Sequence, residues 1–116
     1  MRIVSLDAST SCTGYAVFDG DNLIAHGKIK PHGDDWRDRI MDETMALADL
    51  FRQYNPAFVV AEDVPLKDGK KTIIKLGAVH GMILSLCAGF KIKPLFLLPS
   101  NWRHDIGLFD GTRTGM

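Results

Sequence analysis

The chain has 116 residues, of which 46% are hydrophobic, so we expect one domain built around one packed core. Lys and Arg number 14, as do Asp and Glu, and this balance neither supports nor excludes a nucleic-acid partner, because a local basic patch can act inside a neutral chain. No apolar run reaches the ~20 residues of a membrane span, and the N-terminus leads straight into a strand instead of a signal peptide.

The first thirty residues predict an antiparallel meander of three strands, over 2–8, 13–18 and 23–29. The turn between the second and third strands is Asp19-Gly20-Asp21-Asn22, because Gly and Asn tolerate a positive φ. A helix is expected next, since apolar residues recur at helical spacing over 36–51.

This helix joins the meander to a fourth strand. Asp34 or Asp35 can cap its start, and Asn55-Pro56 ends it. The apolar strand 57–62 follows directly. Because a helix lies between the strands 2–8 and 57–62, we expect a crossover connection and parallel pairing of these two strands.

A second helix is predicted over about 72–88, with Gly89 at its end. Small residues recur along it and let another backbone come close, so it packs tightly either on the sheet or on a second subunit. Residues 94–98 predict a fifth strand, and 99–106 a short helix. The chain then runs into a Gly/Thr loop with no closing element, which suggests an incomplete domain. The small residues of the second helix are Gly77, Ala78, Gly81, Ser85 and Ala88.

Two of the apolar strands end in an acid, which is Asp7 in the first strand and Glu62 in the fourth. If these strands are parallel neighbours, both carboxylates emerge at the same sheet edge. Two carboxylates held close repel each other, and a divalent cation relieves that repulsion. A metal site is therefore favoured over two alternatives, that Asp7 only caps the turn after its strand and that Glu62 pairs with a surface lysine.

Basic residues are concentrated just after Glu62. Beside a metal they can hold a phosphate backbone, whereas on their own they would be read as a solvated loop. Their position next to the two acids favours DNA binding, and Arg103 and Arg113 are weaker candidates of the same kind. The basic residues after Glu62 are Lys67, Lys70, Lys71 and Lys75.

Three motifs together resemble the RuvC-type Holliday junction resolvases. The segments Ile3-Val4-Ser5-Leu6-Asp7-Ala8-Ser9 and Thr13-Gly14-Tyr15-Ala16-Val17 are similar to the opening of that family. Val59-Val60-Ala61-Glu62-Asp63-Val64 resembles its second acidic strand, and Lys75-Leu76-Gly77-Ala78-Val79-His80-Gly81 the start of a later helix. The three motifs cover nearly the whole chain and follow the family's order.

The resemblance implies an α/β fold with an RNase H-like mixed five-stranded sheet, ordered 3-2-1-4-5, with strand 2 antiparallel and helices flanking it. It implies a homodimeric crossover junction endodeoxyribonuclease that hydrolyses phosphodiester bonds in four-way (Holliday) or other branched DNA junctions, using Mg²⁺ or Mn²⁺. Asp7 and Glu62 match the first two catalytic, metal-binding acids of the family. The family also uses a basic residue near the position of Arg103, where it often has Lys.

Two further acids of the family belong to a C-terminal helix. Residues 1–116 are therefore expected to form a single RNase H-like nuclease domain that lacks this helix and cleaves poorly without it. So compact a form resembles the phage-borne branch of the family. The free thiols expected at Cys12 and Cys87, which form no CxxC pattern, fit the cytoplasm of a bacterium or a phage-infected host cell.

Two other interpretations stay open at this point. The segment from Asp7 to Thr13 also resembles the first phosphate motif of actin-like sugar kinases, which share this sheet, so the chain could be an ATP-binding fragment. That interpretation needs a second Asp-x-Gly phosphate motif, which the sequence does not show. The second of these interpretations is a non-catalytic domain that binds junctions without cutting them. ATP binding would identify the first of these, and absence of Mn²⁺ binding would favour the second.

Overall fold

The computed structural model describes residues 1–9, 11–62 and 70–97, with only the backbone described for 70–72. Its elements lie within two residues of the predicted bounds, and the short helix predicted over 99–106 lies outside the described residues. In chain order they are β1 (Arg2–Ala8), β2 (Thr13–Asp19), β3 (Asn22–Ile29), α1 (Trp36–Tyr54), β4 (Phe58–Glu62), α2 (Lys70–Phe90) and β5 (Lys93–Leu97).

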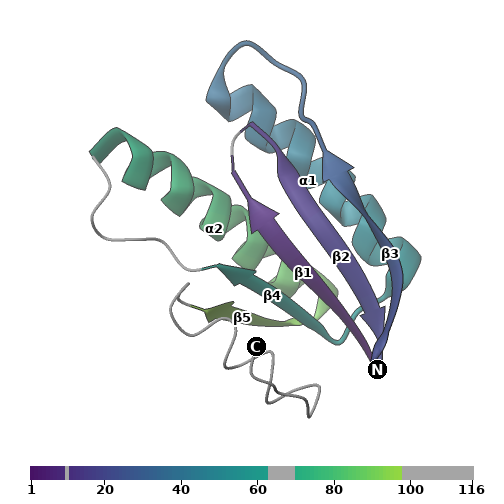
Figure 1. The fold of residues 1–116 in the computed structure, drawn as a ribbon. Coiled ribbons are helices and arrows are strands. Elements are labelled where there is room, and N and C mark those ends of the chain that lie inside the picture. Colours follow the sequence, from purple (N-terminus) through teal and green to yellow (C-terminus); the bar gives the residue numbers. More distant parts are fainter. Residues whose placement is uncertain (10, 63–69, 98–116) are drawn as a thin grey trace, which may run out of the picture.

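The strands form one five-stranded sheet in the order β3-β2-β1-β4-β5. β2 runs antiparallel to both of its neighbours, whereas β1, β4 and β5 run parallel to one another. Figure 1 shows α1 and α2 side by side on one face of this sheet. The predicted fold is therefore confirmed, including the strand order and the antiparallel second strand.

The core lies between the sheet and the two helices. Alternate residues of β1 face the helices, and Val4 and Leu6 are buried there at 0% and 2% exposure. They belong to the same cluster as Phe51 of α1 and Ile83 of α2. Each such side chain contributes roughly 1.5–3 kcal/mol by its burial. Because the pattern along β1 alternates, the residues next to Val4 and Leu6, including Asp7, point to the opposite face of the sheet.

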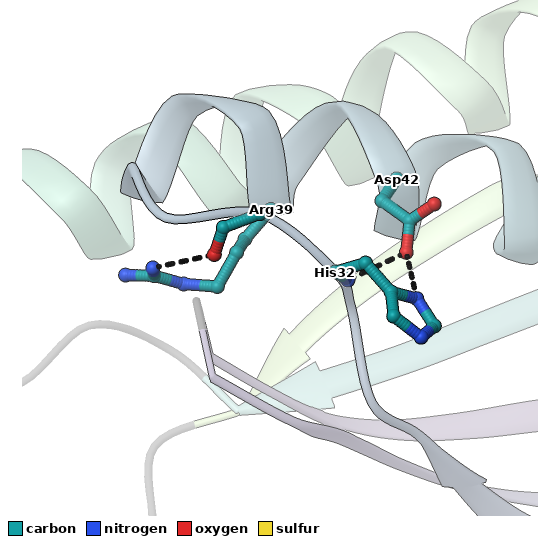
Figure 2. Close-up of polar contacts among 4 residues, drawn as sticks. His32, Arg39 and Asp42 are labelled. Atoms are coloured by element: carbon teal, nitrogen blue, oxygen red, sulfur yellow. Dashed lines mark hydrogen bonds and ion pairs between the residues drawn. The ribbon is translucent and has the colours of Figure 1, made fainter.

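The loop that enters α1 is held by polar contacts (Figure 2). Asp35 caps the helix by accepting a hydrogen bond from the backbone N–H of Arg37. The His32 backbone N–H donates to Asp42 Oδ2 at 2.8 Å, and the Nδ1 atom of His32 lies 3.3 Å from the same oxygen. These hydrogen bonds from His32 lower the pKa of Asp42. The cap at Asp35 marks where α1 begins.

The end of α2 differs from the prediction that Gly89 terminates the helix. The helix continues to Phe90, and Lys91 takes the left-handed conformation with φ 59°. The backbone N–H of Ile92 then bonds to the carbonyl of Cys87 at 2.8 Å, which closes the helix in the manner of a Schellman motif. A lysine here adopts a conformation that more often belongs to glycine, so the sequence placed the stop two residues early.

α2 is apolar on more than one side. Over Ile73–Phe90 it is long and apolar enough, by length and composition alone, to cross a membrane. Its inner side buries Val79 and Ile83 in the core, at 0% exposure each. On the remaining surface, Ile74 and Leu84 are 62% and 47% exposed. The helix therefore carries an apolar face that the sheet does not cover.

Candidate metal centre

Asp7 and Glu62 occupy matching positions on adjacent parallel strands. The parallel register pairs Leu6 of β1 with Ala61 of β4, and the two acids are the next residues on each strand. Leu6 and Ala61 are buried on the helix side at 2% exposure each, whereas both acids are exposed. Because neighbouring strands lie about 4.8 Å apart, the two carboxylates share one end and one face of the sheet.

Both carboxylates lack a side-chain partner within the described part of the chain. The ion pairs among the described residues involve other aspartates, namely Asp19, Asp35, Asp42 and Asp49. Among the same residues, the side chains of Asp7 and Glu62 form no hydrogen bond. Two unit charges at this spacing repel by about 1 kcal/mol in water, and by more when the site is covered. A cation between them would remove that repulsion, so the pair is suited to binding one.

The turn after Asp7 is held by a serine and not by Asp7 itself. Ser9 Oγ accepts hydrogen bonds from the backbone N–H groups of Ser11 and Cys12, at 3.3 and 3.1 Å. It also donates to the carbonyl of Cys12 at 2.8 Å. The alternative in which Asp7 only caps this turn is therefore not supported, and its carboxylate is left for another role.

The acidic pair fits a divalent cation that takes further ligands from elsewhere. Carboxylate oxygens are the donors that Mg²⁺ and Mn²⁺ prefer, and such ions commonly keep several waters. Within 1–9, 11–62 and 73–97, no group of three or more His, Cys, Asp or Glu side chains could hold a metal. The described residues therefore supply two carboxylate ligands, and further ligands would be waters or groups outside these residues.

Comparison with known proteins finds relatives of one kind. No protein-family model matches the chain. A crossover junction endodeoxyribonuclease RuvC from Nitratidesulfovibrio vulgaris is 28% identical over 104 residues, which are 86% of this chain and 63% of the relative. The RuvC of Sphingopyxis alaskensis is 32% identical over 93 residues, which are 76% of this chain and 60% of the relative.

The solved structures agree with these relatives. The structure of T. thermophilus RuvC in complex with a Holliday junction substrate matches with a TM-score of 0.79 at 14% identity, and covers 93% of this chain and 75% of that one. The chain is similar in sequence and in fold to the RuvC-type nucleases. It spans less than two thirds of the length of the two curated relatives, at 63% and 60%. RuvC-type nucleases depend on divalent metal ions.

The structure places only some of the basic residues predicted from the sequence. Lys70 and Lys71 lie in the first turn of α2, and the half-buried Lys75 follows one turn later. Figure 1 shows this start of α2 at the same end of the sheet as the ends of β1 and β4. The acids lie at that end on the opposite face, away from the helices. The other three predicted residues, Lys67, Arg103 and Arg113, lie outside the described residues.

One basic residue near the acids was missed at the level of sequence. Lys28 of β3 pairs with Gly14 of β2, and Gly14 pairs with Asp7. The exposed Lys28 therefore lies in the same cross-strand row as Asp7 and on the same face of this RuvC-type sheet. Gly14, which stands between them, has no side chain to block the path. Alternation along 23–29 was the available signal, but only the register connects Lys28 with the acids.

A buried acid was also missed. Glu43 of α1 is fully buried and accepts a hydrogen bond of 2.8 Å from Thr13 Oγ1, at the start of β2. In the sequence Glu43 stands between Ile40 and Leu47 at helical spacing, within the apolar stripe of the helix. A charged residue inside an apolar stripe was the signal that could have found it.

Proposed function

We propose that this chain forms the catalytic part of a metal-dependent, structure-selective endonuclease that hydrolyses phosphodiester bonds in four-way (Holliday) or other branched DNA. The observation that carries this proposal is the placement of Asp7 and Glu62 side by side on one exposed face of the sheet. The RuvC-type fold supports it, as do relatives named crossover junction endodeoxyribonucleases and a structural neighbour solved with a Holliday junction substrate.

The mechanism follows from charge. Asp7 and Glu62 would hold Mg²⁺ or Mn²⁺, which supplies an activated water and offsets negative charge at the scissile phosphate. The two carboxylates themselves orient the water for in-line attack, and the 3′ oxygen departs on the opposite side. The basic residues would hold phosphates on either side of the cut without reading bases. These are Lys67, Lys70, Lys71, Lys75, Arg103 and Arg113.

We further propose that residues 1–116 act as one nuclease unit within a homodimer. Cutting both strands of a junction requires two sites, and a two-fold axis supplies them. The uncovered face of α2 supports this arrangement, because Gly77 and Gly81 are exposed and a Cβ atom added at either would meet none of the described residues within 4 Å. Together with the exposed Ile74 and Leu84, they offer an apolar surface that a second backbone can approach closely.

The cellular location follows from the family and the thiols. We place the protein in the cytoplasm of a bacterium or a phage-infected host cell. Cys12 and Cys87 are both free, as a reducing compartment requires, and burial raises the pKa of the Cys87 thiol to about 11.

The test is a nicking assay of the full-length protein on a synthetic four-way junction with Mg²⁺. Asp7→Asn and Glu62→Gln should each slow nicking by roughly 10²-fold or more, since they remove a metal ligand outright. Asp21→Asn is the matched control, because Asp21 is an exposed aspartate in the turn between β2 and β3. The proposal is wrong if both site variants nick as fast as the wild type. Binding of ATP with no nicking would favour the sugar-kinase interpretation, and junction binding without Mn²⁺ binding would favour the non-catalytic one.

A further inference from the structure

The core of the described residues contains a polar pair that the proposed mechanism does not use. Thr13 and Glu43 are the buried polar side chains among these residues, and both are 0% exposed. Thr13 Oγ1 donates to Glu43 Oε2 at 2.8 Å, whereas Glu43 Oε1 has no hydrogen-bond partner there. A buried carboxyl without a basic partner is costly, so its presence calls for a reason.

The carboxyl has no compensating charge in contact. Within the described part of the chain Glu43 forms no ion pair, and the neighbouring charges on its own helix are Arg39 and Asp42. Burial raises the pKa of the Glu43 carboxyl, and the hydrogen bond from Thr13 opposes part of that rise. An apolar side chain would fill the same volume at lower cost. What the carboxyl adds is a directional bond to one atom of β2.

The Thr13–Glu43 hydrogen bond lies at the end of β2 that is next to Asp7 of β1. Thr13 is the first residue of β2 and pairs with Ala8, and the next pair along is Gly14 with Asp7. The turn from Ser9 to Cys12 is closed by its own hydrogen bonds. The hydrogen bond from Thr13 to Glu43 therefore ties this end of the β1–β2 hairpin to α1, across 30 residues of sequence.

We propose that Glu43 is a positioning residue, which acts through Thr13 to hold the strand end carrying Asp7 in place for metal binding. The metal-binding part of this inference rests on the proposed function. Its structural part, that the Thr13–Glu43 bond holds the β1–β2 strand ends, does not depend on any metal. Two measurements can therefore test the metal-binding part and the structural part separately.

The first readout is the Mn²⁺ dissociation constant of the full chain. Thr13→Val and Glu43→Leu remove the donor and the acceptor, and each should weaken Mn²⁺ binding by about 10-fold, the lower end for groups that orient metal ligands. Glu43→Gln keeps an acceptor oxygen and should stay within about threefold of the wild type. Leu50→Val, a core change on the same helix, should lower the melting temperature without changing Mn²⁺ affinity. Equal Mn²⁺ affinity in Thr13→Val, Glu43→Leu and wild type would overturn the metal-binding part.

The second readout is amide hydrogen exchange at residues 6–8 and 13–15 without metal. Thr13→Val and Glu43→Leu should speed exchange there by about 10-fold relative to the rest of the sheet, because the strand ends open locally. Leu50→Val should change exchange evenly across the sheet. Unchanged local exchange in both variants would overturn the positioning role altogether. Faster local exchange in both variants, together with a wild-type protein that binds no Mn²⁺, would instead refute the metal site and leave the positioning role standing.

Discussion

Asp7 and Glu62 lie one residue beyond the paired Leu6 and Ala61 on two parallel strands, and both point away from the helices. Such an arrangement stores repulsion between two like charges in the metal-free protein. This repulsion makes the metal-free chain slightly less stable at this edge of the sheet, and binding of a cation would relieve it.

The first prediction concerns stability and metal together. Without metal, Asp7→Asn should raise the free energy of unfolding by about 1 kcal/mol, because it removes the repulsion with Glu62. Saturating Mg²⁺, at about 100 times its dissociation constant, should add about 2.7 kcal/mol to the wild type and nearly nothing to the variant. Thermal unfolding with and without Mg²⁺ measures both effects. A variant that gains as much as the wild type from Mg²⁺ would show that Asp7 does not bind the ion.

The buried carboxyl of Glu43 predicts a pH dependence of stability. A Glu carboxyl in the unfolded chain titrates near ~4.3, and burial raises its pKa in the folded chain. Its contribution is therefore fully present below ~4.3 and is lost as the pH rises through the folded pKa, because the unfolded chain ionises first. Relative to Glu43→Gln, which cannot ionise, the wild type should lose on the order of 1 kcal/mol between pH 4 and pH 8. Urea unfolding of both proteins across this range measures the difference, and two parallel curves would show that Glu43 is not buried as described.

Lys28 is expected to bind DNA through phosphate. Because it shares a row and a face with Asp7, Lys28→Gln should weaken junction binding equally for different sequences. The slope of log affinity against log salt should fall by about one. Fluorescence anisotropy over a salt series measures both. Lys93→Gln, on β5 beside the start of β4, is the control, and an equal loss in this variant would remove any special role for Lys28.

The uncovered face of α2 predicts the oligomeric state. The Cβ of a leucine at position 81 would have no close neighbour among the described residues outside its own helix, so Gly81→Leu should leave the fold intact and block the dimer. Light scattering should then give the mass of one subunit, while the melting temperature at low protein concentration stays unchanged. Met45→Glu, which alters a 70% exposed apolar residue of α1, should leave the dimer in place. A dimeric Gly81→Leu protein would place the interface elsewhere.

The fold and the acidic pair could be predicted because they depend on local patterns. Apolar runs of strand length, turn residues between them and a helix before 57–62 are enough to give the antiparallel meander and the parallel pairing of 2–8 with 57–62. The full strand order was implied by the resemblance to the RuvC-type resolvases. An acid at the end of each apolar strand then marks one edge of the sheet. Confirmation of the strand order is what brings Asp7 next to Glu62.

The other residues depend on contacts that no local pattern specifies. Lys28 lies in the same cross-strand row as Asp7 because of the registers of two antiparallel strand pairs, β1–β2 and β2–β3. The β2–β3 register also shifts between Val17 and Phe18, so it cannot be counted back from the β2–β3 turn. The Thr13–Glu43 bond joins residues that are 30 positions apart. The end of α2 was misplaced because Lys91, and not Gly89, takes the left-handed conformation.

The central claim is that Asp7 and Glu62 hold one and the same cation, and a double-mutant cycle on Mn²⁺ binding tests it most directly. Titration of the wild type, Asp7→Asn, Glu62→Gln and the double variant gives the four dissociation constants. If the ion is shared, each single change should remove most of the affinity and the double variant should lose little more, so the effects are strongly non-additive. Independent, additive losses, or no loss in either single variant, would contradict the account.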